Sequence, residues 1–387
     1  MNLDLHLTTA CNMKCSFCGA WEYGRQQEYI TLEDARAALK AGRQAGYKIT
    51  TLTGGEPSVH RNYTDIIQYA HSLGYWTVVT TNGLHLTDEM LAVYRKCRTL
   101  VRVSLHTLCP RKHAEMTGGD TLHTVMRNIE KLRENKVNLG LGCTVFDKNL
   151  EETDALAEYA CKSGASFIRY TPVVGIRGAE SMNLEYDFFK KLLTEISRLC
   201  LKNYDLMERK TYGREYAHSI TRYMLTRRCA GGSGQHIIYD CHGTVVPCSF
   251  IPESAGLCSP ASDGSAADRF RRVYQNMDEF LGVQQLENMK GRCGKCRYKT
   301  SCRGGCMTTK LPAGLAAADE QPVCMYSLIS EICGGYDAED RYKLENYWCS
   351  NFIKKTGASD RDKVCVRRLP VWELNFRFGA DRMEFVR

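Results

Sequence analysis

The chain has 387 residues, of which 43% are hydrophobic and 25% charged, so it can bury a core of more than one module. Its formal net charge of +8 comes without a long block of Lys and Arg, which argues against nucleic acid as a partner. No apolar run reaches the ~20 residues that a bilayer span needs, and no signal peptide precedes the first strand-like stretch. We therefore expect a cytoplasmic protein without a membrane partner.

The first informative pattern is a group of three cysteines. Residues 3–7 predict a strand, and Cys11, Cys15 and Cys18 follow it with the spacing C-x3-C-x2-C. Three thiolates can hold three irons of a four-iron four-sulfur cluster and leave the fourth iron open to a substrate or cofactor. A structural zinc site is the alternative, but it needs four ligands, and no fourth Cys or His lies nearby in the sequence.

Strand-like and helix-like segments alternate along the first half of the chain. Strands are predicted at residues 3–7, 49–53, 76–81, 100–105, 137–146 and 167–170. Helices are predicted at residues 32–45, 62–73, 87–96, 121–135, 151–163 and 184–205. This alternation predicts an α/β fold in which a parallel sheet with crossover helices forms a partial, TIM-like (β/α)6 barrel.

A second motif, Gly54-Gly55-Glu56-Pro57, ends the second predicted strand. Glycines at a strand end allow a ligand to approach the backbone closely, and Glu56 adds an acceptor beside them. The tetrapeptide alone would be an ordinary turn. It gains weight because it ends the second strand as the three cysteines follow the first, and strand ends are where α/β enzymes place their chemistry.

Together the two motifs resemble the radical SAM superfamily. In that family S-adenosylmethionine (SAM) chelates the open iron, and one electron then releases a 5′-deoxyadenosyl radical. The resemblance implies that the three N-terminal cysteines hold this cluster and that the Gly54–Pro57 loop binds the amino group of SAM. Further implied SAM contacts are Phe17 before the third cysteine and, at strand ends, Asn82, Ser104, Thr144 and Val174. His106 and His113 are candidates for substrate contact, although isolated histidines are usually surface or core residues.

The second half of the chain carries another cysteine pattern. Cys229 and Cys248 form C-x13-G-x4-C, and Cys324 follows a C-x2-C-x5-C-x3-C run made of Cys293, Cys296, Cys302 and Cys306. This order resembles the SPASM extension of radical SAM enzymes, which holds two auxiliary four-iron four-sulfur clusters. The resemblance assigns Cys293, Cys296, Cys302 and Cys324 to a distal cluster, and Cys229, Cys248 and Cys306 to a proximal one.

Two full auxiliary clusters need eight ligands, and the pattern supplies seven. The fourth ligand of the proximal cluster is therefore Cys241, Cys258 or the substrate, or the fourth iron has no ligand from the protein. A zinc ribbon is the alternative for residues 293–306, because C-x2-C pairs suit zinc equally well. The remaining cysteines are scattered, and we expect most of them to be small buried hydrophobes.

These patterns predict three parts of the chain: a radical SAM barrel at residues 1–205, an auxiliary-cluster domain at 206–335 and an extension at 336–387. Residues 252–268 are rich in Ser, Ala, Gly and Asp and predict an exposed loop. Residues 364–378 and 382–387 have strand composition around a turn, so the extension is predicted to end in a β-hairpin, which either captures a peptide or covers the barrel.

The resemblance to radical SAM enzymes with a SPASM extension implies a function, because such enzymes mostly modify peptides or proteins by abstracting a hydrogen atom. The leading hypothesis is a maturase that forms a thioether or carbon–carbon crosslink in a ribosomally made peptide, or epimerises a residue. Such an enzyme needs a reductant such as flavodoxin or ferredoxin. No leader-binding domain precedes the first strand, so leader recognition is expected to need a separate protein, the C-terminal extension, or no leader at all.

Three alternatives remain. Sulfatase-maturase-like dehydrogenases carry Asp directly after the cysteine that matches Cys248, and this chain has Ser249 there. A small-molecule reaction, such as alcohol oxidation or haem decarboxylation, is a second possibility. A non-catalytic electron carrier would explain the late cysteines, but not the open-iron motif with its Gly-Gly-Glu-Pro loop.

Overall fold

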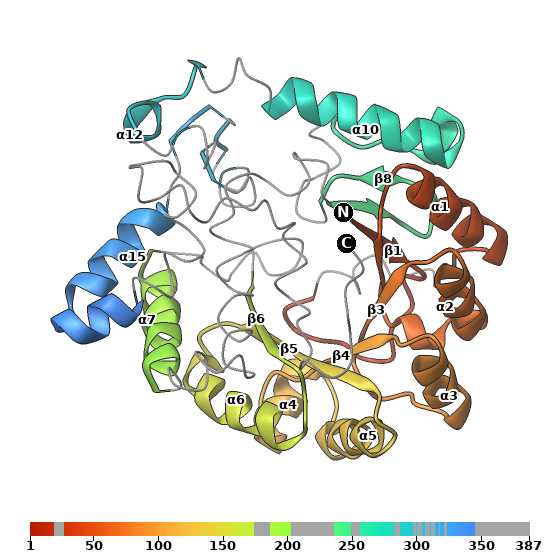
Figure 1. The fold of residues 1–387 in the computed structure, drawn as a ribbon, viewed down its shortest axis with the longest axis horizontal. Coiled ribbons are helices and arrows are strands. Elements are labelled where there is room, and N and C mark those ends of the chain that lie inside the picture. Colours follow the sequence, from red (N-terminus) through yellow and green to blue (C-terminus); the bar gives the residue numbers. More distant parts are fainter. Residues whose placement is uncertain are drawn as a thin grey trace.

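The computed structural model describes most of the first half of the chain and part of the second (Figure 1). The described residues are 1–18, 27–173, 186–202, 236–248, 256–281, 287–296, 299, 304–305, 310, 314–316, 318–320 and 323–344. The predicted C-terminal hairpin and the strand-end residue Val174 lie outside them.

The centre of the fold is one eight-stranded sheet with the order β6-β5-β4-β3-β2-β1-β7-β8. All neighbouring strands are parallel except β7 and β8, which form an antiparallel pair. The strands are β1 (Asn2–His6), β2 (Ile49–Thr53), β3 (Trp76–Thr81), β4 (Leu100–Ser104), β5 (Asn138–Val145), β6 (Ile168–Pro172), β7 (His236–Tyr239) and β8 (Val245–Val246).

Helices surround the curved sheet on its outer side (Figure 1). They are α1 (Leu32–Gln44), α2 (Tyr63–Ser72), α3 (Asp88–Lys96), α4 (Pro110–Thr117), α5 (Leu122–Glu134), α6 (Thr153–Lys162) and α7 (Tyr186–Lys202). The second half adds α10 (Ala266–Leu281), α12 (Gly291–Gly294) and α15 (Met325–Gly334). Short 3-10 helices occur in both halves: η2 (Pro57–Val59), η3 (Leu150–Glu152) and η5 (Ala261–Asp263). The predicted partial barrel of alternating strands and helices is confirmed.

The outward face of the sheet is apolar, whereas its inward face is polar except for an apolar cluster at the amino ends of the strands. Outward positions such as Leu3 and Leu5 are fully buried in the main core beneath the helices. Inward positions alternate with them and are polar and half-buried, as at Asp4 and His6. At the amino ends of the strands, an apolar cluster occupies inward positions: Ile49, Val78, Leu100 and Phe167, with Trp76 packed against them. The polar inward positions at the carboxyl ends of the strands are therefore the place for residues that bind a ligand.

Two segments differ from the sequence prediction. Helix α4 was not predicted, because it is short and its N-cap residue, Cys109, makes no side-chain capping hydrogen bond. The loop predicted at 252–268 is wrong in its last part, because Ser259 is fully buried beside Val245 and α10 begins at Ala266. The missed signal is a capping box, in which Ser265 and Asp268 each accept a hydrogen bond from the other's backbone N–H.

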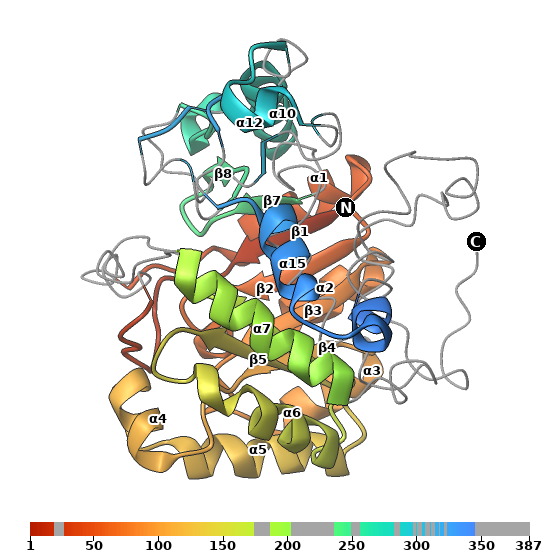
Figure 2. The same ribbon diagram turned by 90° about the vertical axis from the view of Figure 1, so that its left-hand side faces the viewer.

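Among the described residues, the second half of the chain contacts the barrel through β7, α10 and α15. Strand β7 pairs with β1 and so extends the barrel sheet. Helix α15 lies along α7 (Figure 2), where Glu331 accepts hydrogen bonds from Lys190 and Tyr186. The predicted boundary at residue 205 stays a prediction, because residues 203–235 lie outside the described part of the chain.

Candidate active site

The loop after β1 brings the three N-terminal cysteines together. Cys18 N donates to Cys15 O at 3.1 Å, which makes a tight turn. The loop is also tied to the end of α4, because Lys14 N donates to Thr117 O at 3.0 Å and Ser16 N to Met116 O at 2.9 Å. Helix α4, which the sequence analysis missed, therefore supports the loop.

The three thiols fit a shared metal cluster. Burial, followed by the neighbouring Cys18 and Cys11, raises the pKa of Cys15 to about 12. Burial also raises the pKa of Cys11, and the proximity of Glu56 and Cys18 adds to it. Thiols that disfavour one another's negative charge are neutral without a cation, and a bound cluster would convert them to thiolates with release of protons. The donor set of three converging sulfurs thus suits the iron–sulfur group that the spacing predicts.

Gly54 and Gly55 are pressed against the chain's own cysteine loop. Gly55 N donates to Thr8 O at 2.7 Å, and Glu56 N donates to Ala10 O at 2.8 Å. A Cβ atom on Gly54 would lie 2.4 Å from Thr8 O, and one on Gly55 would lie 2.2 Å from Ala10 O. From the sequence, these glycines are predicted to allow the close approach of a ligand. The structure adds that the close neighbour of their Cα atoms is the backbone leading to Cys11.

Glu56 connects the ends of β2 and β3. Its carboxylate is 1% exposed, and it accepts hydrogen bonds from Ser58 N and Oγ at 3.1 and 2.6 Å, Thr81 Oγ1 at 2.7 Å and Asn82 N at 2.7 Å. Burial raises its pKa, although these hydrogen bonds act in the opposite direction. Pro57 begins the buried turn η2 that follows. Glu56 therefore positions Asn82, which the sequence alone did not indicate.

Asn82 lies directly beside the cysteine loop. Its Nδ2 donates to Asn12 Oδ1 at 2.6 Å and lies 4.0 Å from Cys11 Sγ, and its Oδ1 accepts from Leu84 N at 3.0 Å. The Gly54–Pro57 motif, Asn82 and the cysteines, which are separate in the sequence, are thus gathered at the carboxyl ends of β1, β2 and β3.

Phe17 turns toward the carboxyl ends of β4 and β5. Its ring meets that of His106 edge-on at 4.8 Å and that of Phe146 at 5.6 Å. His106 Nδ1 accepts a hydrogen bond from Thr144 N at 3.0 Å, so its proton resides on Nε2. Burial, followed by the proximity of His113, lowers the pKa of His106 to about 3. His106 is therefore a neutral imidazole at neutral pH.

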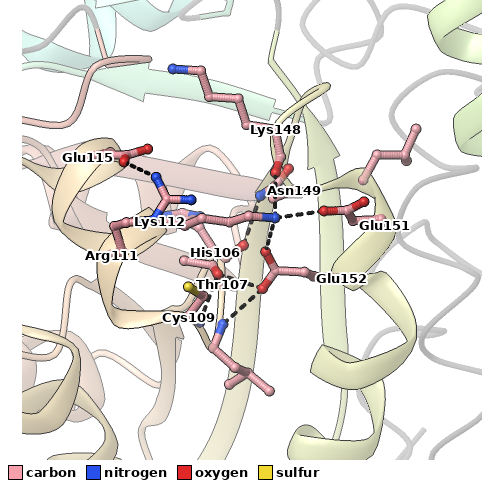
Figure 3. A network of polar contacts seen from close by, with 12 residues as sticks. His106, Thr107, Cys109, Arg111, Lys112, Glu115, Lys148, Asn149, Glu151 and Glu152 are labelled. Atoms are coloured by element: carbon pink, nitrogen blue, oxygen red, sulfur yellow. Dashed lines mark hydrogen bonds and ion pairs between the residues drawn. The ribbon is translucent and has the colours of Figure 1, made fainter.

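A polar network fixes the loops around His106 (Figure 3). Asn149 is fully buried, and its Nδ2 donates to His106 O and to Thr144 O, both at 2.8 Å. Glu152 accepts from Thr107 Oγ1 at 2.5 Å and forms an ion pair with Lys112 at 2.9 Å. Burial alone would raise the pKa of Glu152, but the hydrogen bonds from Lys112, Thr107 and Leu108 outweigh it and lower the pKa. Asn149 and Glu152 were not identified from the sequence.

The other predicted SAM contacts lie on the inward face of the sheet. Ser104 pairs with Gly142, and Thr144 pairs with Thr171, so both hydroxyl-bearing residues occupy inward positions at strand ends. Both are half-buried. His113 is fully buried, and its Nε2 lies 3.0 Å from Thr121 Oγ1.

The late cysteines are described in part. Cys293 and Cys296 flank the end of α12, and Cys324 precedes α15. Arg292 lies close enough to Cys293 and Cys324 for both to affect its pKa, which hydrogen bonding to Glu320 raises first. These described members of the predicted distal set therefore share one neighbourhood. Cys229, Cys302 and Cys306 lie outside the described residues.

The comparison with known families decides the identity of the first domain. The Radical SAM superfamily matches residues 5–160, which include the cysteine loop, the Gly54–Pro57 motif and strand ends β1 to β5. The chain carries a radical SAM domain. Within the described residues, no helix is both long and apolar enough to cross a membrane.

Relatives match far beyond that domain. The AdoMet-dependent heme synthase of Methanosarcina barkeri is 27% identical over 339 residues, which cover 83% of this chain and 95% of the relative. The mycofactocin maturase MftC of Mycolicibacterium smegmatis is 23% identical over 332 residues, or 84% of this chain and 82% of the relative.

Solved structures share the fold. Streptococcus suis SuiB bound to S-adenosylmethionine has a TM-score of 0.66 and 16% identity, and the match covers 84% of this chain and 77% of SuiB. The protein anSMEcpe with bound AdoMet and a peptide also has a TM-score of 0.66 and 16% identity, over 92% of this chain and 98% of that chain.

Proposed function

We propose that this chain reductively cleaves SAM and uses the resulting radical to abstract a hydrogen atom from a ribosomally synthesised peptide. The observation that carries the first part is the convergence of Cys11, Cys15 and Cys18 beside Asn82 within a radical SAM domain. A cluster and SAM bound there would supply the 5′-deoxyadenosyl radical. The residues of this chain would bind the cluster and SAM and orient them toward the substrate.

Each residue has a role that follows from its position. The three thiolates hold the cluster, and Asn82 and the Gly54–Pro57 loop border the place where SAM meets it. Phe17 and His106 form an apolar and neutral wall on the other side. Ser104 and Thr144 offer hydroxyl groups from the inward face of the sheet.

A peptide substrate is supported by the relatives rather than by a side chain. SuiB has been solved bound to its precursor peptide SuiA, with a TM-score of 0.62 to this chain, and MftC is named a maturase. We therefore propose crosslinking or epimerisation of a peptide. A reductant such as flavodoxin or ferredoxin would supply the electron, and leader recognition would use a separate protein, the C-terminal extension, or no leader at all.

A second candidate is a small-molecule reaction on a haem precursor. Three AdoMet-dependent heme synthases are 24% to 27% identical to this chain, and the matches cover 86% to 95% of their lengths. This extent of matching favours a haem-type substrate over other metabolites, and the substrate experiment below separates it from the peptide.

The auxiliary clusters belong to the same proposal, and the register of the β7–β8 hairpin supports a preference for the fourth ligand of the proximal cluster. Cys248 follows β8, and Val245 of that strand bridges to Ser259, next to Cys258. Cys241 lies in the turn between β7 and β8, at the other end of the hairpin. Because Ser259 opposes Val245 in an antiparallel bridge, Cys258 is level with Val246, two extended residues or about 7 Å from Cys248. Cys241 lies in the turn before Val245, and Val245 is already three extended residues, or about 10 Å, from Cys248. We therefore favour Cys258 over Cys241 as a fourth ligand beside Cys248.

The first experiment tests cofactor cleavage. Anaerobically reconstituted and reduced protein is incubated with SAM, and 5′-deoxyadenosine is quantified. The wild-type protein should form it, and a Cys11→Ala, Cys15→Ala, Cys18→Ala triple variant should not, while it keeps its remaining iron. Cys161→Ala is the matched control, because Cys161 is exposed on α6. SAM cleavage by the triple variant would refute the site.

The second experiment tests the substrate class. Candidate peptides encoded beside the gene and an iron porphyrin carrying propionates are prepared with deuterium at the positions to be attacked. Transfer of deuterium into 5′-deoxyadenosine identifies the substrate by mass spectrometry. Transfer from the porphyrin but from none of the peptides would overturn the peptide proposal and leave radical SAM cleavage intact.

A further inference from the structure

The turn between β7 and β8 brings three different metal-binding groups together outside the predicted cluster sites. Cys241 Sγ, one ring nitrogen of His242 and one carboxylate oxygen of Glu28 all lie within 4.8 Å of one another. His242 Nδ1 and Glu28 Oε2 are only 2.5 Å apart. Cys241 and His242 belong to the second half of the chain, whereas Glu28 lies just after the cysteine loop.

The backbone holds both sides of this group in place. Asp240 Oδ1 accepts from His242 N at 3.0 Å and from Thr244 N at 2.7 Å, which fixes the turn. Gly243 closes the turn with a φ of +83°, a conformation that favours glycine. On the other side, Glu28 O accepts from Thr9 N at 3.0 Å, and Glu28 N donates to Thr9 Oγ1 at 3.0 Å.

The surroundings of the three groups favour a cation. Burial raises the pKa of Cys241 to about 12, and the negative charges of Asp240 and Glu28 add to the effect. The carboxylate of Asp240 is occupied by the turn, so Glu28 is the acidic group that faces the thiol and the imidazole. The side chains of His242 and Glu28 are 47% and 40% exposed, so an ion can enter from solvent.

We propose that Glu28, Cys241 and His242 bind one zinc ion, with a fourth position left to water. Sulfur, imidazole nitrogen and carboxylate oxygen are the ligand atoms that zinc uses, at about 2.0–2.3 Å. Tetrahedral ligands at such distances are roughly 3.5 Å apart. Cys241 Sγ, which lies within 4.8 Å of both other groups, would therefore have to approach by at most about 1.3 Å, and the His242–Glu28 pair, now 2.5 Å apart, would have to open by about 1 Å. A simple His242–Glu28 ion pair is the alternative, but it leaves the placement of Cys241 beside both groups unexplained.

The proposed ion would join the two halves of the protein next to the active site. Glu28 pairs with Thr9, and Thr9 lies two residues before Cys11. A backbone hydrogen bond from Thr9 to Cys241 already links the turn to this segment. Zinc would therefore fix the β7–β8 hairpin against the base of the cysteine loop. This inference is independent of the proposed peptide or haem substrate.

The test uses the reconstituted holoenzyme and zinc as the probe. After incubation with zinc and desalting, the wild-type protein should retain about one zinc per chain. Zinc-edge X-ray absorption should then show one sulfur neighbour at about 2.3 Å and nitrogen or oxygen neighbours at about 2.0–2.1 Å. An absorption edge without a sulfur neighbour would overturn the proposal, even if zinc is retained.

Variants supply the second readout. Loss of a group that only supports a metal ligand costs about 10–100-fold in affinity, so Cys241→Ala or His242→Ala should each weaken zinc binding by at least about 100-fold. Cys161→Ala should bind as the wild type does. Iron content and circular dichroism of each variant verify the fold. Unchanged zinc affinity in a Cys241→Ala, His242→Ala double variant would refute the site, and loss of iron from Cys241→Ala would assign this thiol to a cluster instead.

Discussion

Replacing Gly55 with alanine should displace the cysteine loop. The added Cβ would lie 2.2 Å from Ala10 O and 2.7 Å from both Ala10 C and Thr9 O, which are backbone atoms. Ordinary contacts begin near about 3.4 Å, so the loop has to move by roughly 1 Å. Overpacking of this kind costs about 1–3 kcal/mol. Loss of the 2.8 Å hydrogen bond from Glu56 N to Ala10 O adds about 1 kcal/mol.

The expected result is a free energy of unfolding that is lower by about 2–4 kcal/mol, with a larger loss of function. Urea unfolding of the metal-free protein measures the first quantity. Iron bound by the N-terminal site and the rate of 5′-deoxyadenosine formation measure the second, and we expect the rate to fall by at least about tenfold. Gly334→Ala is the matched control, because its added Cβ meets no atom within 4 Å. If Gly55→Ala unfolds and cleaves SAM as Gly334→Ala does, the packing argument is wrong.

Three further predictions rest on local features of the structure. Asn149→Ala removes the donor to His106 O and Thr144 O and should lower the free energy of unfolding in urea by about 2–4 kcal/mol. Asn135→Ala, which loses one exposed hydrogen bond, should change it by less than about 0.5 kcal/mol, and equal effects would contradict the network. Because the pKa of His106 is lowered to about 3 in the folded state, its contribution to stability is present above about pH 6.5 and is lost as the pH falls toward 3. Lowering the pH from 7.5 to 5.5 should therefore cost about 1.4 kcal/mol in urea titrations, and His106→Asn, whose Oδ1 can accept from Thr144 N, should remove this share of the loss. Finally, Cys258→Ala should lower the iron content of the second half of the chain, whereas Cys241→Ala should not, and the reverse order would refute the register argument.

The parallel barrel was predictable because its strands carry strong local signals. Residues 49–53 and 76–81 are rich in β-branched residues and end at Gly54 and Asn82, and both strands have the predicted bounds in the structure. Strand β7 was not predicted, because four residues before a turn carry too little pattern, and its place beside β1 follows from tertiary pairing.

The candidate site was predictable in its members, but not in their interactions. The spacing of Cys11, Cys15 and Cys18 and the Gly54–Pro57 motif are visible in the sequence. The register between β1, β2 and β3 decides that Glu56 accepts a hydrogen bond from Asn82 N and that Gly55 packs against Ala10. No local pattern reports such a register. The same holds for Glu28 beside Cys241, because β7 had first to be placed next to β1.

The sheet directs Cys11 and Cys248 toward opposite ends of the barrel. Cys11 follows β1 at its carboxyl end, whereas Cys248 lies two residues beyond Val246, which pairs with Ile238 in the antiparallel β7–β8 hairpin, on the side away from the turn. Ile238 in turn is level with Asp4 in the middle of β1. Between the two ends lie inward polar groups such as Arg102, which donates to Thr80 Oγ1 at 2.6 Å. A substrate radical formed near Cys11 would therefore face a polar interior with the proposed proximal cluster beyond it. This arrangement suits an electron acceptor that lies across the substrate from SAM, which agrees with the proposed role of Cys248 as a ligand of the proximal cluster.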